Sequence, residues 1–163
     1  MTRVVLVPGV LALLPEHAGL ADPVAELRAA CLAAVATLGV DVEVLASGSG
    51  ARVARHLLDQ VPRSGDHPSY LVVGNGSAMR TEKAPGHLDE RAADFDARLH
   101  AALVEPDPVA LTHFDQGLAT DLWADTGQLG RLGELLAGDC DVQVTYADAP
   151  YGVQYWVVTW TTG

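Results

Sequence analysis

The chain has 163 residues, of which 49% are hydrophobic and 19% charged, so we expect a single domain over residues 1–163 with a substantial core. Ten basic residues against 21 acidic ones give a formal charge of −11. A surface of that sign repels phosphate backbones and anionic lipid headgroups, which argues against nucleic-acid and membrane partners.

Hydrophobic spacing predicts alternating strands and helices in the N-terminal half. Residues 3–7 form an apolar, β-branched run that is typical of a buried strand. Asp22 and Pro23 are an N-cap and a first-turn proline, and the helix that they begin is expected to stop at Gly39. Residues 40–45 then alternate as a less buried strand. A loop over 47–50, a short helix over 53–58 and a third strand over 70–73 follow.

The C-terminal half is predicted to hold several short helices and two strands. Asp89 is expected to cap a helix whose apolar face includes Phe95 and Leu99, and the Glu-Pro-Asp-Pro run at 105–108 ends it. Residues 109–137 indicate two or three short helices, and 141–146 and 153–160 two strands, with Tyr155 and Trp156 on opposite faces. This order predicts an α/β fold, a three-layer α/β/α sandwich around a mostly parallel or mixed sheet.

The cysteines and histidines show no metal-binding or redox spacing. Cys31 and Cys140 lie far apart and form no CxxC pair, so we expect two reduced, packed thiols in a cytoplasmic protein. The six histidines form no metal-binding motif, so no metal site is predicted. The apolar run at 4–14 looks like part of a signal peptide, but Pro8 and Gly9 interrupt it and favour a strand and its loop.

The segment from Gly74 to His87 is the predicted site, because ligands of α/β proteins bind beyond the ends of strands. It follows the third strand and contains Lys83, the only lysine of the chain. Its polar side chains either line a cleft or form a solvated charged loop, and both interpretations stay open. They are those of Arg80, Glu82, Lys83 and His87.

The turn that opens this segment carries no recognised catalytic or nucleotide motif. Gly74 to Ala78 contains neither a G-x-G-x-x-G fingerprint nor G-x-S-x-G, so we interpret it as a structural turn and Ser77 as no nucleophile. Glycines at such a turn also let a ligand approach the backbone. The ligand-binding candidates are Gly9, Asn75, Ser77 and Arg80, and the catalytic candidates are Glu82, Lys83 and His87.

Three segments of the chain resemble the LigB-like superfamily, the class III extradiol ring-cleaving dioxygenases and their Memo-type relatives. They are Gly74 to Asp96 with its Glu-Lys-Ala-Pro-Gly core, the opening Val7 to Glu16, and Asp148 to Tyr155. The last segment resembles the end of short actinobacterial members, and the chain is shortened around residues 40–68 relative to the family.

The resemblance implies an iron site that this chain lacks the residues to build. Family members hold Fe(II) with two histidines and a carboxylate and use a further histidine as acid–base. The opening histidine falls on Gly9 and the acid–base histidine on Ala78, while the second iron histidine belongs to the shortened region. Glycine and alanine cannot ligate a metal or transfer a proton, so we expect no iron, no cofactor and no dioxygenase activity.

The leading hypothesis is therefore a degenerate LigB-like domain that binds a small molecule at residues 75–87 or serves as a partner subunit, as a homodimer or with a homologous protein. A second hypothesis is an enzyme with a repurposed site, in which Arg80, Glu82 and Lys83 orient an anionic substrate and His87 supplies acid–base chemistry. Two further hypotheses are a residual class III extradiol-type dioxygenase and a purely structural or regulatory protein.

Overall fold

The computed structural model describes residues 1–15 and 23–163, and its centre is one five-stranded mixed sheet with the strand order β2-β3-β1-β5-β4. The strands are β1 (Thr2–Val7), β2 (Val42–Leu45), β3 (Ser69–Val73), β4 (Cys140–Asp148) and β5 (Tyr155–Thr162). β1, β2 and β3 run parallel, β5 is antiparallel to β1, and β4 is antiparallel to β5. The predicted α/β fold with a mixed sheet is confirmed.

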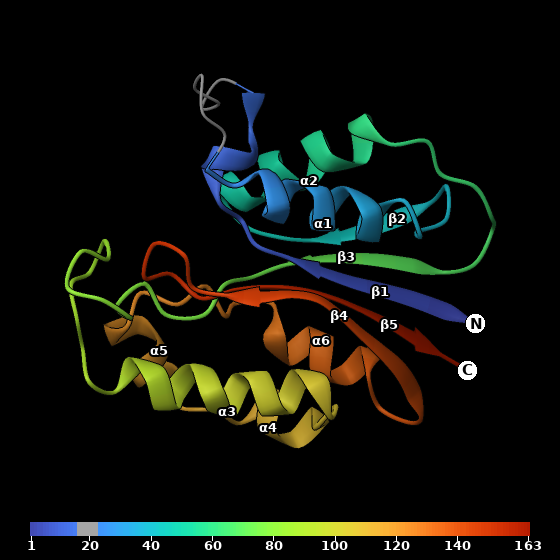
Figure 1. The fold of residues 1–163 in the computed structure, drawn as a ribbon. Coiled ribbons are helices and arrows are strands. Elements are labelled where there is room, and N and C mark those ends of the chain that lie inside the picture. The colour runs from blue at the N-terminus through green and yellow to red at the C-terminus, as the bar shows by residue number, and fades with distance from the viewer. Residues whose placement is uncertain (16–22) are drawn as a thin grey trace.

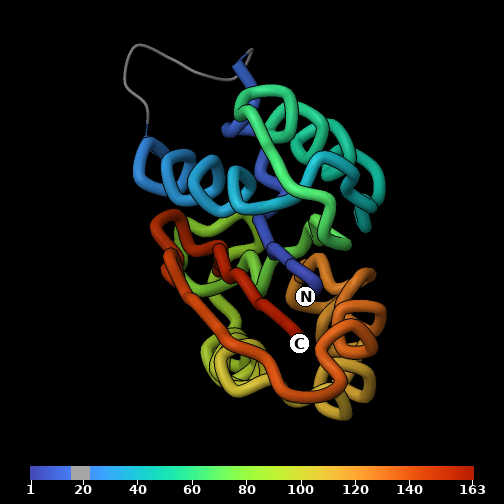
Figure 2. The backbone as a smooth tube through the Cα atoms, turned by 90° about the vertical axis from the view of Figure 1, so that its right-hand side faces the viewer, coloured from blue at the N-terminus to red at the C-terminus, as the bar shows by residue number. Residues whose placement is uncertain are grey.

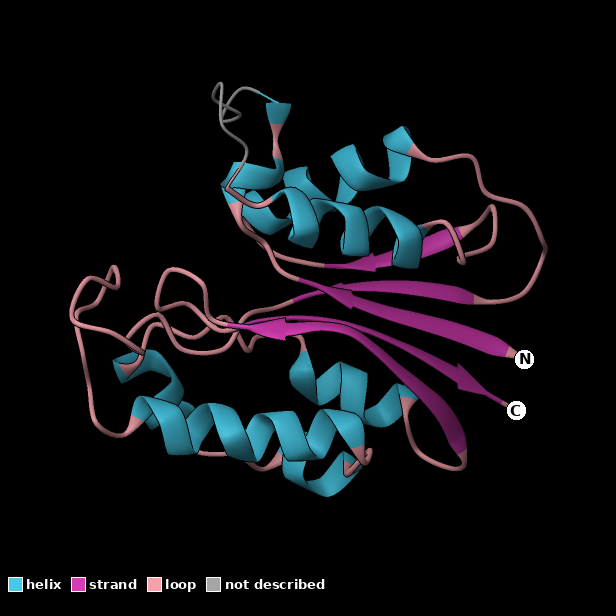
Figure 3. Cartoon of the chain, viewed as in Figure 1, coloured by secondary structure: helices cyan, strands magenta, loops and turns pink. Residues whose placement is uncertain are grey.

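Helices cover both faces of the sheet, which gives the three predicted layers (Figures 1 and 3). The helices of one face are α1 (Ala25–Val35) and α2 (Ser49–Gln60), with the 3-10 turn η1 (Leu11–Leu13) beside α2. Those of the other face are α3 (Ala92–Val104), α4 (Pro108–Thr112), α5 (Gln116–Asp121) and α6 (Leu129–Leu135). None of the helices within the described residues is long and apolar enough to cross a membrane.

The sheet separates two hydrophobic cores because successive side chains of a strand point to opposite faces. In β1, Val5 and Val7 belong to the core under α1 and α2, whereas Val4 and Leu6 belong to the core under the other helices. The predicted alternation near the C-terminus is confirmed, since Tyr155 lies in the first core and the next residue, Trp156, in the second. Cys31, as predicted, is buried, in the first core.

The start of α2 differs from its prediction. The sequence pattern predicts a loop over 47–50, yet the helix begins at Ser49 after Gly48, whose φ of 56° is left-handed. Gly50 fits there because it packs against β3, where a Cβ would lie 3.0 Å from Cγ1 of Val73. A close helix–strand approach selects glycine here, although glycine in a sequence pattern more often indicates a loop.

The cap at the start of α3 also differs from its prediction, whereas the helix ends at Val104, directly before the Glu-Pro-Asp-Pro run at 105–108, as predicted. Asp89 does not cap α3: its carboxylate accepts from the backbone N–H of Arg91 at 2.8 Å, and Arg91 occupies the N-cap position without a capping side-chain bond. Asp107 caps α4 by accepting from Ala110 N, and Pro108 is the first residue of that helix. The Asp22 cap lies outside the described residues.

The chain leaves β1 and β3, which are neighbours, on opposite faces of the sheet. β1 is followed by α1 on one face, and β3 by the long loop to α3 on the other (Figures 1 and 2). Such a switch point is where open α/β sheets place ligands, outside the carboxyl ends of their strands. Gly9 follows β1 and Asn75 follows β3. The topology therefore brings the segment after β1 and the loop from Gly74 to His87 together at this edge of the sheet.

Candidate functional site

Protein groups occupy the switch point between β1 and β3. The backbone N–H of Gly9 donates to Oδ1 of Asn75 at 3.0 Å. Asn75 also pairs its backbone with Asp125 in both directions, at 3.0 and 3.1 Å. A Cβ on Gly9 would lie 2.9 Å from Cγ1 of Val73. Gly9 and Asn75 therefore contact each other, and this contact gives both a structural role.

Gly9 and Ala78, which the resemblance aligns with a metal-binding histidine and an acid–base histidine, do not fit an iron centre. Gly9 supplies no side chain. Ala78 supplies only a buried methyl group, and its backbone N–H donates to the carbonyl of Leu122 at 2.9 Å. Within residues 1–15 and 23–163, no group of three or more His, Cys, Asp or Glu side chains could hold a metal ion. Among the residues that the structure describes, the side chains therefore offer no donor set for the iron site that the resemblance to the LigB-like superfamily implies.

The polar centre near this edge is the buried carboxylate of Asp96 on α3, which is only 2% exposed. Its Oδ1 accepts from the backbone N–H of Ser77 at 2.7 Å, and its Oδ2 accepts from the hydroxyl of Ser77 at 2.6 Å. Burial raises the pKa of Asp96, and the hydrogen bonds from Ser77 and the charge of Arg80 partly offset that rise. Ser77 is itself fully buried, so it holds Asp96 in place and does not reach solvent.

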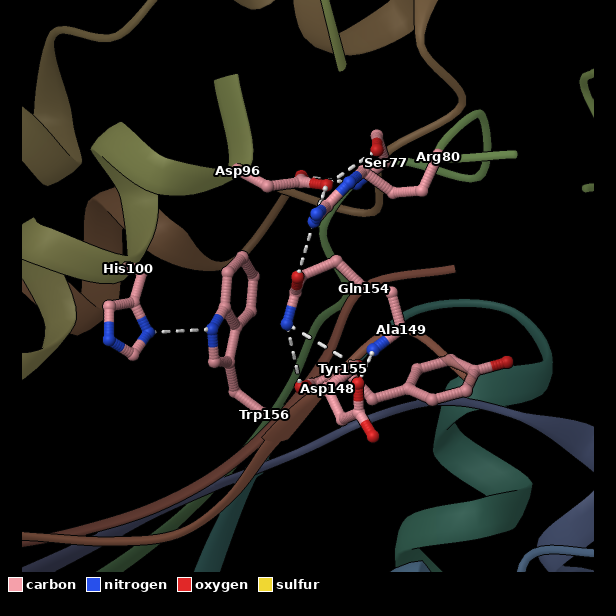
Figure 4. A network of polar contacts seen from close by, with 9 residues as sticks. All are labelled: Ser77, Arg80, Asp96, His100, Asp148, Ala149, Gln154, Tyr155 and Trp156. Atoms are coloured by element: carbon pink, nitrogen blue, oxygen red, sulfur yellow. Dashed lines mark hydrogen bonds and ion pairs between the residues drawn. The ribbon is translucent and has the colours of Figure 1, made fainter. Parts of the chain in front are cut away.

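Arg80 joins this carboxylate to the C-terminal segment. Its NH1 lies 3.4 Å from Oδ2 of Asp96 and donates to Oε1 of Gln154 at 2.8 Å. Figure 4 shows the guanidinium between these two side chains. The side chain of Arg80 is 31% exposed, and no atom of the described residues accepts from its Nε or NH2. One edge of the guanidinium is therefore fixed and the other is available to a ligand.

Backbone pairing explains why residues so far apart in sequence meet here. The loop after β3 lies along the segment before β5, with bonds from Gly76 N to Gln154 O and from Gln154 N to Ser77 O, both 2.9 Å. Gly76 must be glycine in this arrangement, since a Cβ would lie 2.6 Å from Oδ1 of Asp96 and 2.7 Å from Cβ of Gln154. Gly152, with φ of 76°, accepts from Arg80 N at 3.0 Å through its carbonyl.

His100, one turn after Asp96 on α3, is oriented by a buried tryptophan. The indole N–H of Trp156 donates to Nδ1 of His100 at 3.2 Å (Figure 4). An acceptor nitrogen carries no hydrogen, so in the neutral ring the hydrogen is on Nε2. Trp156 is only 2% exposed, whereas His100 is exposed. The bond therefore orients a solvent-facing imidazole from the protein interior.

These side chains line a cavity of about 270 Å³, here called the Arg80 cavity. Its walls come from the loop after β3, from α3, and from the neighbouring ends of β4 and β5: Arg80, Ala93, Asp96, Ala97, His100, Ala147 and Gln154. The volume lies just below the range of roughly 300–1,000 Å³ that drug-sized ligands fill. Three of the lining residues are alanines, whose small side chains leave space between the polar groups.

The catalytic candidates of the sequence lie elsewhere on the same loop. Glu82, Lys83 and His87 are all exposed, and none of them lines the Arg80 cavity. His87 has φ of 60°, and its Nδ1 lies 3.2 Å from the carbonyl of Glu82, a contact within the loop. Of the predicted site residues, only Arg80 lines this cavity, whereas Gly9, Asn75 and Ser77 take structural positions.

Sequence reasoning missed Asp96, His100, Gln154 and Asp125 as site residues. Asp96 gave a detectable signal, because a carboxylate four residues after the buried Ala92 occupies a core position of the helix. Asp125 gave no such signal: it is half-buried beside Gly9, and burial raises its pKa.

Neither protein-family models nor curated proteins give a match to the chain. The candidate site is therefore described from its geometry alone.

Proposed function

We infer that this chain is a small-molecule-binding α/β domain of LigB-like ancestry that lacks the iron site and is not a dioxygenase. Its ligand is a small molecule that presents a carboxylate or carbonyl oxygen to Arg80 in the Arg80 cavity. The observation that carries the inference is the guanidinium of the partly exposed Arg80, which is bonded through NH1 to Asp96 and Gln154, whereas its Nε and NH2 have no acceptor among the described residues.

The arrangement of Arg80 favours an oxygen-bearing ligand for two reasons. A guanidinium presents several N–H donors in a planar fork, which matches the two oxygens of a carboxylate. Its position is set before any ligand arrives, because NH1 is bonded to both neighbours and Gln154 is held in turn through Nε2 to the carbonyl of Tyr155 at 3.2 Å. A preorganised donor loses little conformational freedom on binding.

The same contacts favour binding over catalysis. Both oxygens of Asp96 already accept hydrogen bonds from Ser77, so the carboxylate is not free to remove a proton from a ligand. The exposed His87 and Lys83 do not line the cavity. An enzyme with a repurposed site at residues 75–87 therefore receives less support than a binding domain.

Binding is tested with two probes of the same size, propionate and propionamide, followed by amide and side-chain chemical shifts. Propionate is expected to shift signals of Arg80, His100 and Gln154, with a dissociation constant on the order of 1 mM, which is about −4.1 kcal/mol. Arg80→Gln is expected to weaken propionate about tenfold, because a charged hydrogen bond is lost. Arg91→Gln is the control: it removes an exposed arginine at the start of α3, whose partners are Asp89 and Asp121 and which does not line the Arg80 cavity.

The loss of the family reaction is tested separately on protein purified without chelators. Metal analysis is expected to find iron, zinc and manganese well below one atom per chain, and catechol is expected to stay unopened. Stoichiometric metal together with ring opening would refute the proposed function. Propionate that shifts no signal around the Arg80 cavity would favour a partner subunit, which needs no ligand.

A further inference from the structure

A second cavity lies on the other flank of α3 and differs in character from the Arg80 cavity. It has a volume of about 270 Å³ and lies between α3 and the α4–α5 segment (Figure 2 shows α3 beside these helices on the same side of the sheet). Its apolar lining includes Phe95, Leu99, Ala110, Phe114 and Leu118. Phe114 and Leu118 pack against the core but stay only half-buried, so they keep apolar surface toward the cavity.

Two opposite charges stand at this cavity. Arg98 is exposed, and within the described part of the chain it has no hydrogen-bond or ion-pair partner. Asp115 is also exposed, and one of its oxygens, Oδ1, accepts from Leu118 N at 2.9 Å as the cap of α5. The second oxygen has no acceptor role among the described residues. An unpaired guanidinium and a carboxylate with a free oxygen thus border one apolar space.

We propose that this cavity is a binding site for an aromatic α-amino acid, with Arg98 pairing with the ligand carboxylate, Asp115 with its ammonium group, and the phenyl ring between Phe95 and Phe114. Aromatic rings gain from edge-to-face or offset contacts beyond their burial. A zwitterion has no net charge, so the formal charge of −11 on the protein does not repel it. The site is independent of the proposed function, since none of its lining residues lines the Arg80 cavity.

Three probes separate the contributions of the ligand's charges: L-phenylalanine, 3-phenylpropionate without the ammonium group, and phenethylamine without the carboxylate. In a chemical-shift titration, L-phenylalanine is expected to shift the signals of Phe95, Phe114 and Leu118. Each of the remaining two probes is expected to bind about fivefold to tenfold more weakly, because one charged contact is missing. Equal binding of 3-phenylpropionate and L-phenylalanine would overturn the role of Asp115 and with it the amino-acid assignment.

Two charge-removing variants complete the test, and each is designed to fold. Arg98→Gln alters an exposed side chain, and Asp115→Asn keeps a good N-cap residue for α5. Each is expected to weaken L-phenylalanine about fivefold or more, and Asp115→Asn should leave 3-phenylpropionate unchanged. Arg91→Gln is the control arginine. Repeating the titration in the Arg80→Gln background separates this site from the first, and L-phenylalanine that shifts no signal at Phe95 or Phe114 in either background would refute the proposal.

Discussion

Ser77 presents two donors to the two oxygens of one buried side chain: its backbone N–H to Oδ1 of Asp96 at 2.7 Å and its hydroxyl to Oδ2 at 2.6 Å. This pair joins the loop after β3 to α3, the helix that forms one wall of each of the two described cavities. Because Asp96 also contacts Arg80, the geometry of the proposed ligand-binding guanidinium depends on the Ser77–Asp96 pair.

Removing the carboxylate should therefore destabilise the fold. In Asp96→Ala, the buried N–H and hydroxyl of Ser77 lose their acceptors and Arg80 loses its counter-charge. We expect the free energy of unfolding in urea to fall by about 3 kcal/mol. Asp94→Ala, an exposed acid on the same helix, should change it by no more than about 0.5 kcal/mol. Equal effects of the two substitutions would show that the Ser77–Asp96 pair adds nothing to stability.

The raised pKa of Asp96 predicts a pH dependence with a definite sign. The folded state keeps the Asp96 proton to a higher pH than the unfolded chain, whose aspartate pKa is about 3.9. The contribution to stability is complete below the unfolded pKa and is lost as the pH rises through the folded one. Carboxyl carbon shifts of Asp96 should titrate above the ordinary aspartate value. In Asp96→Asn this part of the pH dependence of unfolding should vanish, and a midpoint below the ordinary value would contradict the prediction.

Strands and helices with regular hydrophobic spacing could be predicted from the sequence, because burial dictates that spacing. The apolar run of β1 and the alternation that separates Tyr155 from Trp156 are local signals of this kind. The start of α2 could not be read in this way. There the chain uses Gly50 to approach Val73, and a contact between distant segments overrides the local preference of glycine.

The site was predictable only in part, for the same physical reason. The position of the loop from Gly74 to His87 follows from its place after β3, and Arg80 does line a cavity. Which of its polar residues face inward depends on partners 16 to 74 residues away, such as Asp96 and Gln154. These contacts between distant residues cannot be inferred from the composition of the loop. The sequence therefore does not distinguish Arg80 from the exposed Lys83 and His87.

Close packing at Gly76 predicts a large effect from one added methyl group. A Cβ there would lie 2.6 Å from Oδ1 of Asp96 and 2.7 Å from Cβ of Gln154, so Gly76→Ala must displace both. We expect a loss of about 2–4 kcal/mol in the free energy of unfolding. Gly130→Ala is the matched control, since a Cβ on Gly130 in α6 would have no neighbour within 4 Å. It should raise stability by up to about 1 kcal/mol.

The two cysteines should differ in their reactivity toward a thiol reagent. Cys31 is fully buried, and burial raises the pKa of its thiol to about 12, so almost no thiolate forms at neutral pH. Cys140, at the start of the edge strand β4, is partly exposed, although burial and the charges of Asp141 and Asp139 also raise its pKa. Mass spectrometry after iodoacetamide treatment should show one slow modification, at Cys140, in the native protein and two in urea. Cys140→Ser should leave the native protein unmodified, and labelling of Cys31 at a rate similar to that of Cys140 would mean that the core under α1 and α2 opens readily.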